Sequence, residues 1–211
     1  MMKDLSGRKI YVAISAAIVW FALCLQFNIS LNLANGATLT TLKIFLSYFT
    51  VTTNILVGIC LLTLWLFEVR NAGHFFFKAS TQTAITVYIL VVCLTYNIML
   101  RGLIPLSGWP RVADELLHVV DPLLFLGFWI FYTPKIVIPY KNAMTWLTYP
   151  VLYVLMTVIR GHLIQQYPYP FIDVTKLGYP RAILNAVLIL AIFWLLSLLF
   201  IFISRKLAKH A

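Results

Sequence analysis

The stretch Ala182-Ile-Leu-Asn-Ala-Val-Leu-Ile-Leu-Ala-Ile-Phe-Trp-Leu-Leu-Ser-Leu-Leu-Phe-Ile-Phe-Ile203 contains no charged residue and lies between Arg181 and Arg205. An α-helix rises about 1.5 Å per residue, so a run of about 20 apolar residues spans the roughly 30 Å hydrocarbon core of a bilayer. The sequence therefore predicts a transmembrane helix over 182–203.

Five more predominantly apolar segments precede it, at about 10–33, 44–67, 79–100, 112–132 and 143–159. The whole chain is 62% hydrophobic and 10% charged, with a mean hydropathy of +0.94, which is outside the range of water-soluble domains. The first segment is longer than the core of a signal peptide and lacks a clean cleavage site, so we expect a retained helix. Short connections and uniform composition predict one integral membrane domain over 1–211: an all-α, polytopic bundle of six transmembrane helices.

The net charge of +10 is spread over the ends of these segments. Scattered basic residues serve membrane topology and do not form a patch for nucleic acid, so no nucleic-acid partner is expected. If the segments alternate in direction, ten Lys and Arg residues fall on the side of the termini and six on the other, which predicts that both termini are cytoplasmic. Cys24, Cys60 and Cys93 occur singly in apolar segments, so we expect no disulfide, no metal site and no cofactor.

The fourth segment carries ionisable residues at membrane depth. Arg111, Asp114, His118 and Asp121 are spaced by three, four and three residues, which places them on one face of a regular helix. Such groups are costly in a bilayer unless they face a bundle interior, and they are functional-site candidates by default. Pro122 lacks an amide hydrogen and should leave carbonyls for a neighbour to satisfy. Alternatively, Arg111 and Asp114 form an interfacial ion pair and His118 is a packing residue.

The second segment carries a hydroxyl and amide stripe. Ser47, Thr50 and Asn54 lie at i, i+3 and i+7, with Thr53 beside them. Thr50 and His118 each lie seven residues past a basic residue at the outer end of their segment, which puts both at a depth of roughly 10 Å. A threonine hydroxyl and an imidazole are therefore expected to meet.

Other segments bring polar groups to the same outer layer, namely Asn97, Arg101, Thr157, Arg160, Arg181 and Asn185. The loop between the last two segments reads Tyr167-Pro-Tyr-Pro-Phe-Ile-Asp173, a proline- and aromatic-rich sequence that could cap the bundle or form an ordinary aromatic belt. Its Asp173 is expected to pair with an outer arginine or to be solvated.

Several runs in this chain resemble the androgen-induced and androgen-dependent membrane hydrolases, six-helix proteins that cleave fatty acid esters of hydroxy fatty acids. The runs shared with that family are Ser-Tyr-Phe-Thr50, Leu-Leu-His118 with a proline four residues on, and Tyr169-Pro-Phe-Ile-Asp173. The resemblance is closer to bacterial relatives, through Thr-Thr-Asn54, Tyr-Asn-x-x-Leu-Arg-Gly102, Asp-Glu-Leu-Leu-His118, Tyr149-Pro, Arg-Gly161 and Tyr-Pro-Tyr-Pro-Phe171.

This resemblance implies a location in the bacterial plasma membrane and a catalytic Thr and His at the matching positions, Thr50 and His118. The eukaryotic members lack the acidic stripe, so it implies no role for Asp114 or Asp121.

Together, the residues and the resemblance predict an intramembrane threonine hydrolase of lipid esters. Thr50, or alternatively Thr53, is the expected nucleophile and His118 the general base, oriented by Asp114 or Asp121. The expected groups for the oxyanion and for an acidic lipid substrate are Asn54, Asn97, Arg101, Arg160, Arg181 and Asn185.

Three other functions fit parts of the pattern. A proton-coupled transporter or channel could use the Asp, His and Arg cluster, although the inner half offers no matching pathway. A metal-dependent hydrolase could use Asp114, His118 and Asp121 as ligands, although no HExxH-like signature supports it. A non-catalytic protein could bind a lipid in the same cavity.

Overall fold

The structure is a computed structural model that describes residues 2–67 and 74–208, with side chains from residue 6 onward. Within these ranges the chain is helical almost throughout and forms no strand. Six helices there are long and apolar enough to cross a membrane: Ser6–Leu33, Phe49–Leu66, Ala79–Leu100, Gly108–Tyr132, Asn142–Ile164 and Val174–Ala208. The predicted all-α integral membrane architecture is therefore confirmed. Arg70 and Lys209, which enter the charge count for orientation, lie outside the described residues, and the cytoplasmic termini remain a prediction.

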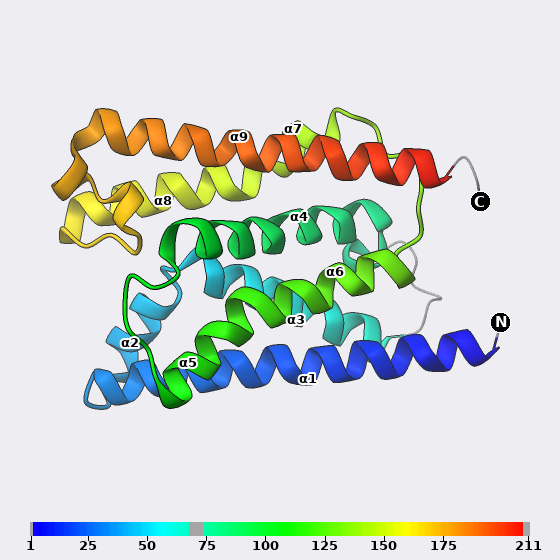
Figure 1. The fold of residues 1–211 in the computed structure, drawn as a ribbon, viewed down its shortest axis with the longest axis horizontal. Coiled ribbons are helices and arrows are strands. Elements are labelled where there is room, and N and C mark those ends of the chain that lie inside the picture. The colour runs from blue at the N-terminus through cyan, green and yellow to red at the C-terminus, as the bar shows by residue number, and fades with distance from the viewer. Residues whose placement is uncertain (1, 68–73, 209–211) are drawn as a thin grey trace. The chain divides into compact units, whose positions relative to one another are not determined.

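The chain divides into two compact units, Met1–Pro134 and Lys135–Ala211. Unit 1 comprises α1 (Met2–Leu33), α2 (Thr38–Phe45), α3 (Phe49–Leu66), η2 (Phe75–Phe77), α4 (Ala79–Thr95), η3 (Tyr96–Leu100), α5 (Gly108–Glu115), η4 (Leu116–Val120) and α6 (Asp121–Tyr132). Unit 2 comprises α7 (Asn142–Trp146), α8 (Thr148–Ile164), η5 (Pro170–Ile172) and α9 (Val174–Ala208) (Figure 1). That the chain forms one domain remains a prediction.

The core of unit 1 lies between α1, α3, α4 and α6, which run side by side in alternating directions (Figure 1). The helices approach closely where small residues occur, since a Cβ on Gly58 of α3 would lie 3.0 Å from Trp20 Nε1 of α1. Polar side chains add specific links, because Trp129 Nε1 donates to Thr83 Oγ at 3.0 Å and joins α6 to α4. Hydrogen bonds between helices are worth about 1 kcal/mol in membrane bundles, so most of the stability comes from packing.

The second predicted segment, 44–67, is interrupted in the structure. The helix α2 ends at Phe45, Tyr48 is extended with φ −88° and ψ 128°, and α3 begins at Phe49. Ser47 helps to end α2, because its hydroxyl donates to the carbonyl of Ile44 at 2.6 Å. The seven-residue count from Lys43 to Thr50 therefore crosses a break, and Thr50 lies in the first turn of α3.

Unit 2 is built on α8 and α9, joined by the loop over 165–173 that contains η5. The helix α9 begins at Val174 and bends at Gly178, whose φ of 71° is accessible to glycine, just before Pro180. Near its end, Ser204 donates to the carbonyl of Ile136 at 2.8 Å and fixes the segment before α7. The sixth predicted segment, 182–203, lies in α9 beyond the bend.

Candidate functional site: a histidine and an aspartate between two π-helical turns

Two π-helical turns, η3 and η4, interrupt the transmembrane helices of unit 1. The turn η3 follows α4, and η4 joins α5 to α6. In each turn the backbone hydrogen bonds join residues five apart, in place of the four of an α-helix. Such turns are rare and occur frequently at functional sites. Here they bring two rings together, since Tyr96 of η3 stacks on His118 of η4 with centroids 4.1 Å apart and an angle of 17° between the planes.

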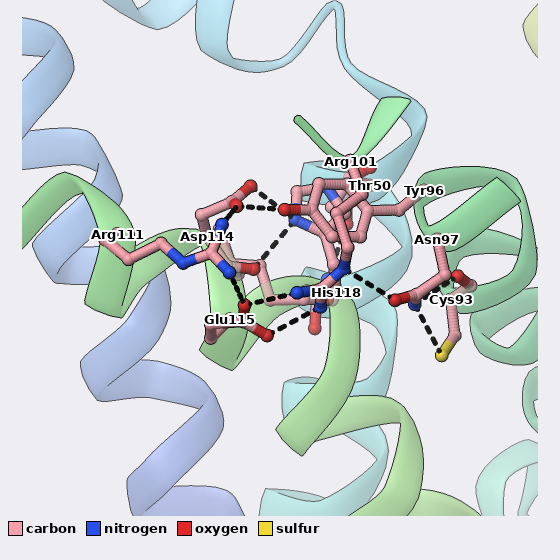
Figure 2. Close-up of polar contacts among 11 residues, drawn as sticks. Thr50, Cys93, Tyr96, Asn97, Arg101, Arg111, Asp114, Glu115 and His118 are labelled. Atoms are coloured by element: carbon pink, nitrogen blue, oxygen red, sulfur yellow. Dashed lines mark hydrogen bonds and ion pairs between the residues drawn. The ribbon is translucent and has the colours of Figure 1, made fainter. Parts of the chain in front are cut away.

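His118 is oriented by Asp114, one turn before it in the chain. Its Nδ1 lies 3.1 Å from Asp114 Oδ1 and 2.8 Å from the backbone carbonyl oxygen of Asp114 (Figure 2). Both neighbours are acceptors, so the neutral imidazole carries its proton on Nδ1. The lone pair then lies on Nε2, which is the arrangement that a general base needs. The predicted contact between Asp114 and His118 is present.

Asp114 is itself held in place by two further side chains. The hydroxyl of Tyr96 donates a hydrogen bond to its Oδ2, and Arg111 Nη1 lies 3.8 Å from the same oxygen. The predicted ion pair between Arg111 and Asp114 therefore exists in addition to the contact with His118, and the two interpretations of this stripe do not exclude each other. Sequence reasoning did not identify Tyr96, although it stands next to Asn97 in a polar run at the end of its segment.

A second carboxylate, Glu115, joins two arginines beside this pair (Figure 2). Arg101 donates to both Glu115 oxygens at 2.7 and 2.8 Å, and Arg111 Nη2 lies 2.5 Å from Oε1. Hydrogen bonding to Glu115 raises the pKa of Arg101, whose guanidinium also lies 5.0 Å from the Tyr96 ring centroid. Sequence reasoning gave Glu115 no role in the site, but its spacing of four from Arg111 is a usual signal for a helical ion pair.

Asn54 links α3 to the π-helical turn η4. Its Nδ2 donates to the carbonyl of Thr50 at 2.8 Å and to that of Leu117 at 3.2 Å. The Leu117 carbonyl needs this donor, because the amide of Asp121 bonds Leu116 instead and Pro122 has no amide hydrogen. The prediction that Pro122 would leave a carbonyl for a neighbour is confirmed.

This link brings the first turn of α3, and with it Thr50, against the turn that carries His118. Thr50 belongs to the group of polar contacts drawn in Figure 2. Its residue is 8% exposed, whereas Thr53 is completely buried. A nucleophile must be reached by substrate, so the exposure favours Thr50 over Thr53.

The two asparagines expected to stabilise an oxyanion already use both of their amide hydrogens. Asn54 Nδ2 serves the two carbonyls just described. Asn97 Nδ2 donates to the Cys93 carbonyl at 2.8 Å and approaches its sulfur at 3.5 Å, while Oδ1 accepts from Arg101 Nε. Both side chains therefore hold backbone and neighbouring groups in this structure.

Asp121 does not join the stripe that the regular spacing predicted. The extra residue in η4 changes the helical register between His118 and Asp121, and Asp121 is completely buried. Neither of its carboxylate oxygens has a hydrogen-bond partner among residues 6–67 and 74–208. Asp114, and not Asp121, orients the imidazole.

The remaining predicted site residues belong to unit 2. Arg160 Nη1 approaches the Gln166 carbonyl at 3.4 Å, Asn185 Nδ2 donates to the Phe171 carbonyl at 2.8 Å, and Arg181 is exposed. Arg160 and Asn185 thus hold the loop over 165–173. Asp173 caps α9 by accepting from the Thr175 amide at 3.1 Å, and its expected pairing with an arginine is replaced by Lys176 at 3.6 Å.

In the part of the chain that the structure describes, no group of three or more His, Cys, Asp or Glu residues is placed to hold a metal ion. The set Asp114, His118 and Asp121, considered above as metal ligands, is therefore not assembled. A groove of about 650 Å³ lies elsewhere on unit 1 and is mostly apolar. It is lined by Phe21, Leu25, Asn28, Ile29, Asn32, Leu33 and Trp109.

The fold and the site define an integral membrane protein with a histidine and aspartate pair set between π-helical turns. Comparison with known protein families, with characterised proteins and with solved structures gives no match.

Proposed function

We propose that the protein is an intramembrane hydrolase of lipid esters, with Thr50 as nucleophile and His118 as general base. The observation that carries this proposal is the pair of acceptors at His118 Nδ1, at 2.8 and 3.1 Å, which directs the basic lone pair to Nε2. A threonine hydroxyl is a weak nucleophile and needs such a base.

In the proposed reaction, Thr50 Oγ attacks the ester carbonyl carbon while its proton passes to His118 Nε2. Asp114 stabilises the imidazolium that forms. The tetrahedral intermediate then expels the alcohol, which takes the proton from His118, and water releases the acid from Thr50 by the same steps. Because Thr50 lies in the first turn of an 18-residue helix, the positive end of the α3 dipole lies beside the developing oxyanion.

The groove on unit 1 has a largely aliphatic and aromatic lining of the kind that accepts an acyl chain, although neither Thr50 nor His118 is among its lining residues. Arg101 is bound on two nitrogens by Glu115, so it would have to exchange this partner to hold the carboxylate of an acidic substrate. We place the protein in a bacterial plasma membrane with both termini cytoplasmic.

Labelling of the purified protein with a serine-hydrolase-type phosphonate, followed by mapping of the modified residue, tests this proposal. We expect the label on Thr50, and a loss of ester hydrolysis of about 10³-fold or more in Thr50→Val and His118→Gln. Thr52→Val is the matched control, because the Thr52 hydroxyl bonds carbonyls of its own helix at 3.2 and 3.4 Å.

An unlabelled protein whose turnover of a panel of lipid esters is the same in Thr50→Val would refute the proposal. A label on Thr53 would keep the reaction and change the nucleophile. Intact lipid in a purified sample without turnover would instead indicate a lipid-binding protein, and pH-driven flux in proteoliposomes that is lost in His118→Gln would indicate a transporter.

A further inference from the structure

Beneath the proposed catalytic pair, a layer of buried polar atoms in unit 1 lacks partners. Both carboxylate oxygens of Asp121, Oδ1 of Asn54 and Nε1 of Trp20 are buried and without a hydrogen bond among the described side chains and backbone. They come from three helices, α6, α3 and α1. Buried polar groups are almost always satisfied in folded proteins, so four such atoms require an explanation.

Helical register places these three side chains at neighbouring levels. Asn54 bonds the carbonyl of Leu117, and α3 runs in the same direction as α5 to α6 (Figure 1). Gly58 lies four residues beyond Asn54, about one turn of α3, and Asp121 lies four residues beyond Leu117 across the π-helical turn η4, so the two residues lie at a similar depth. Gly58 is the residue against which the Trp20 indole packs, since a Cβ there would lie 3.0 Å from Nε1.

The unsatisfied atoms of Asn54 and Trp20, one acceptor and one donor, are chemically complementary to a neutral carboxylic acid at Asp121. An ionised Asp121 would offer only acceptors, and it would leave the acceptor Asn54 Oδ1 without a donor. A carboxylate inside a membrane bundle is also unfavourable without a cation or several donors. A protonated Asp121 supplies one donor and keeps one acceptor, which match Asn54 Oδ1 and the Trp20 indole N–H respectively.

We propose that Asp121 is a proton-binding site: at neutral pH it is a neutral acid that donates to Asn54 Oδ1 and accepts from Trp20 Nε1. One proton then satisfies all four atoms. Because the same Asn54 amide holds the carbonyls of Thr50 and Leu117, the acid fixes the contact between α3 and η4 from below. The proposal does not depend on the protein being a hydrolase.

No cation on the neighbouring elements replaces this proton. None of the described titratable or charged side chains on the elements packed against α6 and η4 forms a hydrogen bond with Asp121. These side chains are Arg8, Lys9, Tyr11, Cys24, Cys60, Tyr88, Cys93, Tyr96, Arg111, Asp114, Glu115 and His118. His118 is the closest of these in the chain, and it points its Nδ1 at Asp114.

Infrared spectroscopy of the purified protein at neutral pH tests the proposal directly. We expect the carbonyl stretch of a protonated carboxylic acid in the wild type and its loss in Asp121→Asn. Trp20→Phe should keep the band and shift it to higher frequency, because a hydrogen bond to the acid carbonyl is removed. A spectrum without this band, or with a band that Asp121→Asn leaves in place, would overturn the proposal.

Thermal unfolding gives a second, independent measurement. Asn is a neutral isostere that can donate to Asn54 and accept from Trp20, so Asp121→Asn should keep the unfolding midpoint within about 2 °C. Asp121→Leu, which leaves both partners unsatisfied, should lower it by roughly 5 °C or more. A larger loss in Asp121→Asn than in Asp121→Leu would contradict a neutral acid. So would a stabilisation by NaCl over choline chloride that disappears in Asp121→Asn, because it would assign a bound cation instead.

Discussion

Replacing Asn54 by Leu tests whether this side chain compensates for the amide that Pro122 lacks. Leucine has the same number of side-chain heavy atoms and the same branching as asparagine, so the change removes hydrogen bonds without opening a cavity. It leaves the carbonyl of Leu117, a residue that is 2% exposed, without a donor. An orphaned buried carbonyl costs about 1–3 kcal/mol, and at 2 kcal/mol the unfolding midpoint should fall by roughly 4–8 °C.

The assay is reversible unfolding of the purified protein in mixed detergent micelles. Asn28→Leu is the matched control, because the Asn28 side chain is exposed and accepts a hydrogen bond from Asn32 of the same helix, at 3.1 Å. We expect this control to change stability by less than about 0.5 kcal/mol.

A double-mutant cycle with Pro122→Ala tests directly whether the Asn54 side chain replaces the amide hydrogen that Pro122 lacks. Alanine restores an amide hydrogen at position 122, which can donate to the Leu117 carbonyl as a continuation of the π-helical turn. The cost of Asn54→Leu should then fall by about 1 kcal/mol in the Pro122→Ala background. An equal cost in both backgrounds, or a cost no greater than that of Asn28→Leu, would refute the assignment.

Three other predictions concern the site and unit 2. Asp114→Asn should lower ester hydrolysis about 10³- to 10⁴-fold while the fold is retained, measured as turnover beside the circular dichroism spectrum; turnover within a factor of three of wild type would exclude Asp114 as the orienting group. The Thr175 hydroxyl lowers the pKa of Asp173, so this contribution to stability is complete above the unfolded-state pKa of about 4 and is lost as pH falls below it. Amide protection at the start of α9 should therefore drop as pH falls below about 4, and less so in Thr175→Ala; equal drops would contradict this. Gly161→Ala should destabilise unit 2, because the new Cβ would overlap the Tyr167 ring, and Tyr167→Ala should rescue it in thermal unfolding; no rescue would point to another cause.

The six membrane-spanning helices were predictable because their signal is compositional. Twenty apolar residues between charges leave a helix as the usual solution in lipid. The break between α2 and α3 was not predictable in this way, because residues 46–48 contain no proline, no glycine and no charged residue. It depends on one local bond, from Ser47 to the Ile44 carbonyl, that competes with continuing the helix.

The candidate site was predictable only as far as regular helical spacing holds. Asp114 and His118 are four residues apart within one turn, and their contact follows from that spacing. Between His118 and Asp121 the helix is still π-helical as far as Val120. A spacing of three residues therefore no longer places the two side chains on the same face of the helix. Tyr96 comes from another helix through a second π-helical turn, and spacing along one segment carries no information about it.

The π-helical turn η4 divides the fourth membrane helix into two α-helical segments. The faces of these segments are rotated relative to those of one regular α-helix. Upstream of this turn, Asp114 and His118 face Tyr96, and downstream Asp121, Phe125 and Phe128 face the apolar core. A one-residue deletion within 116–120 would restore regular α-helical phase and rotate one segment by about 100° relative to the other. The length of this short segment, more than its composition, therefore decides whether reactive and packing residues can share one helix.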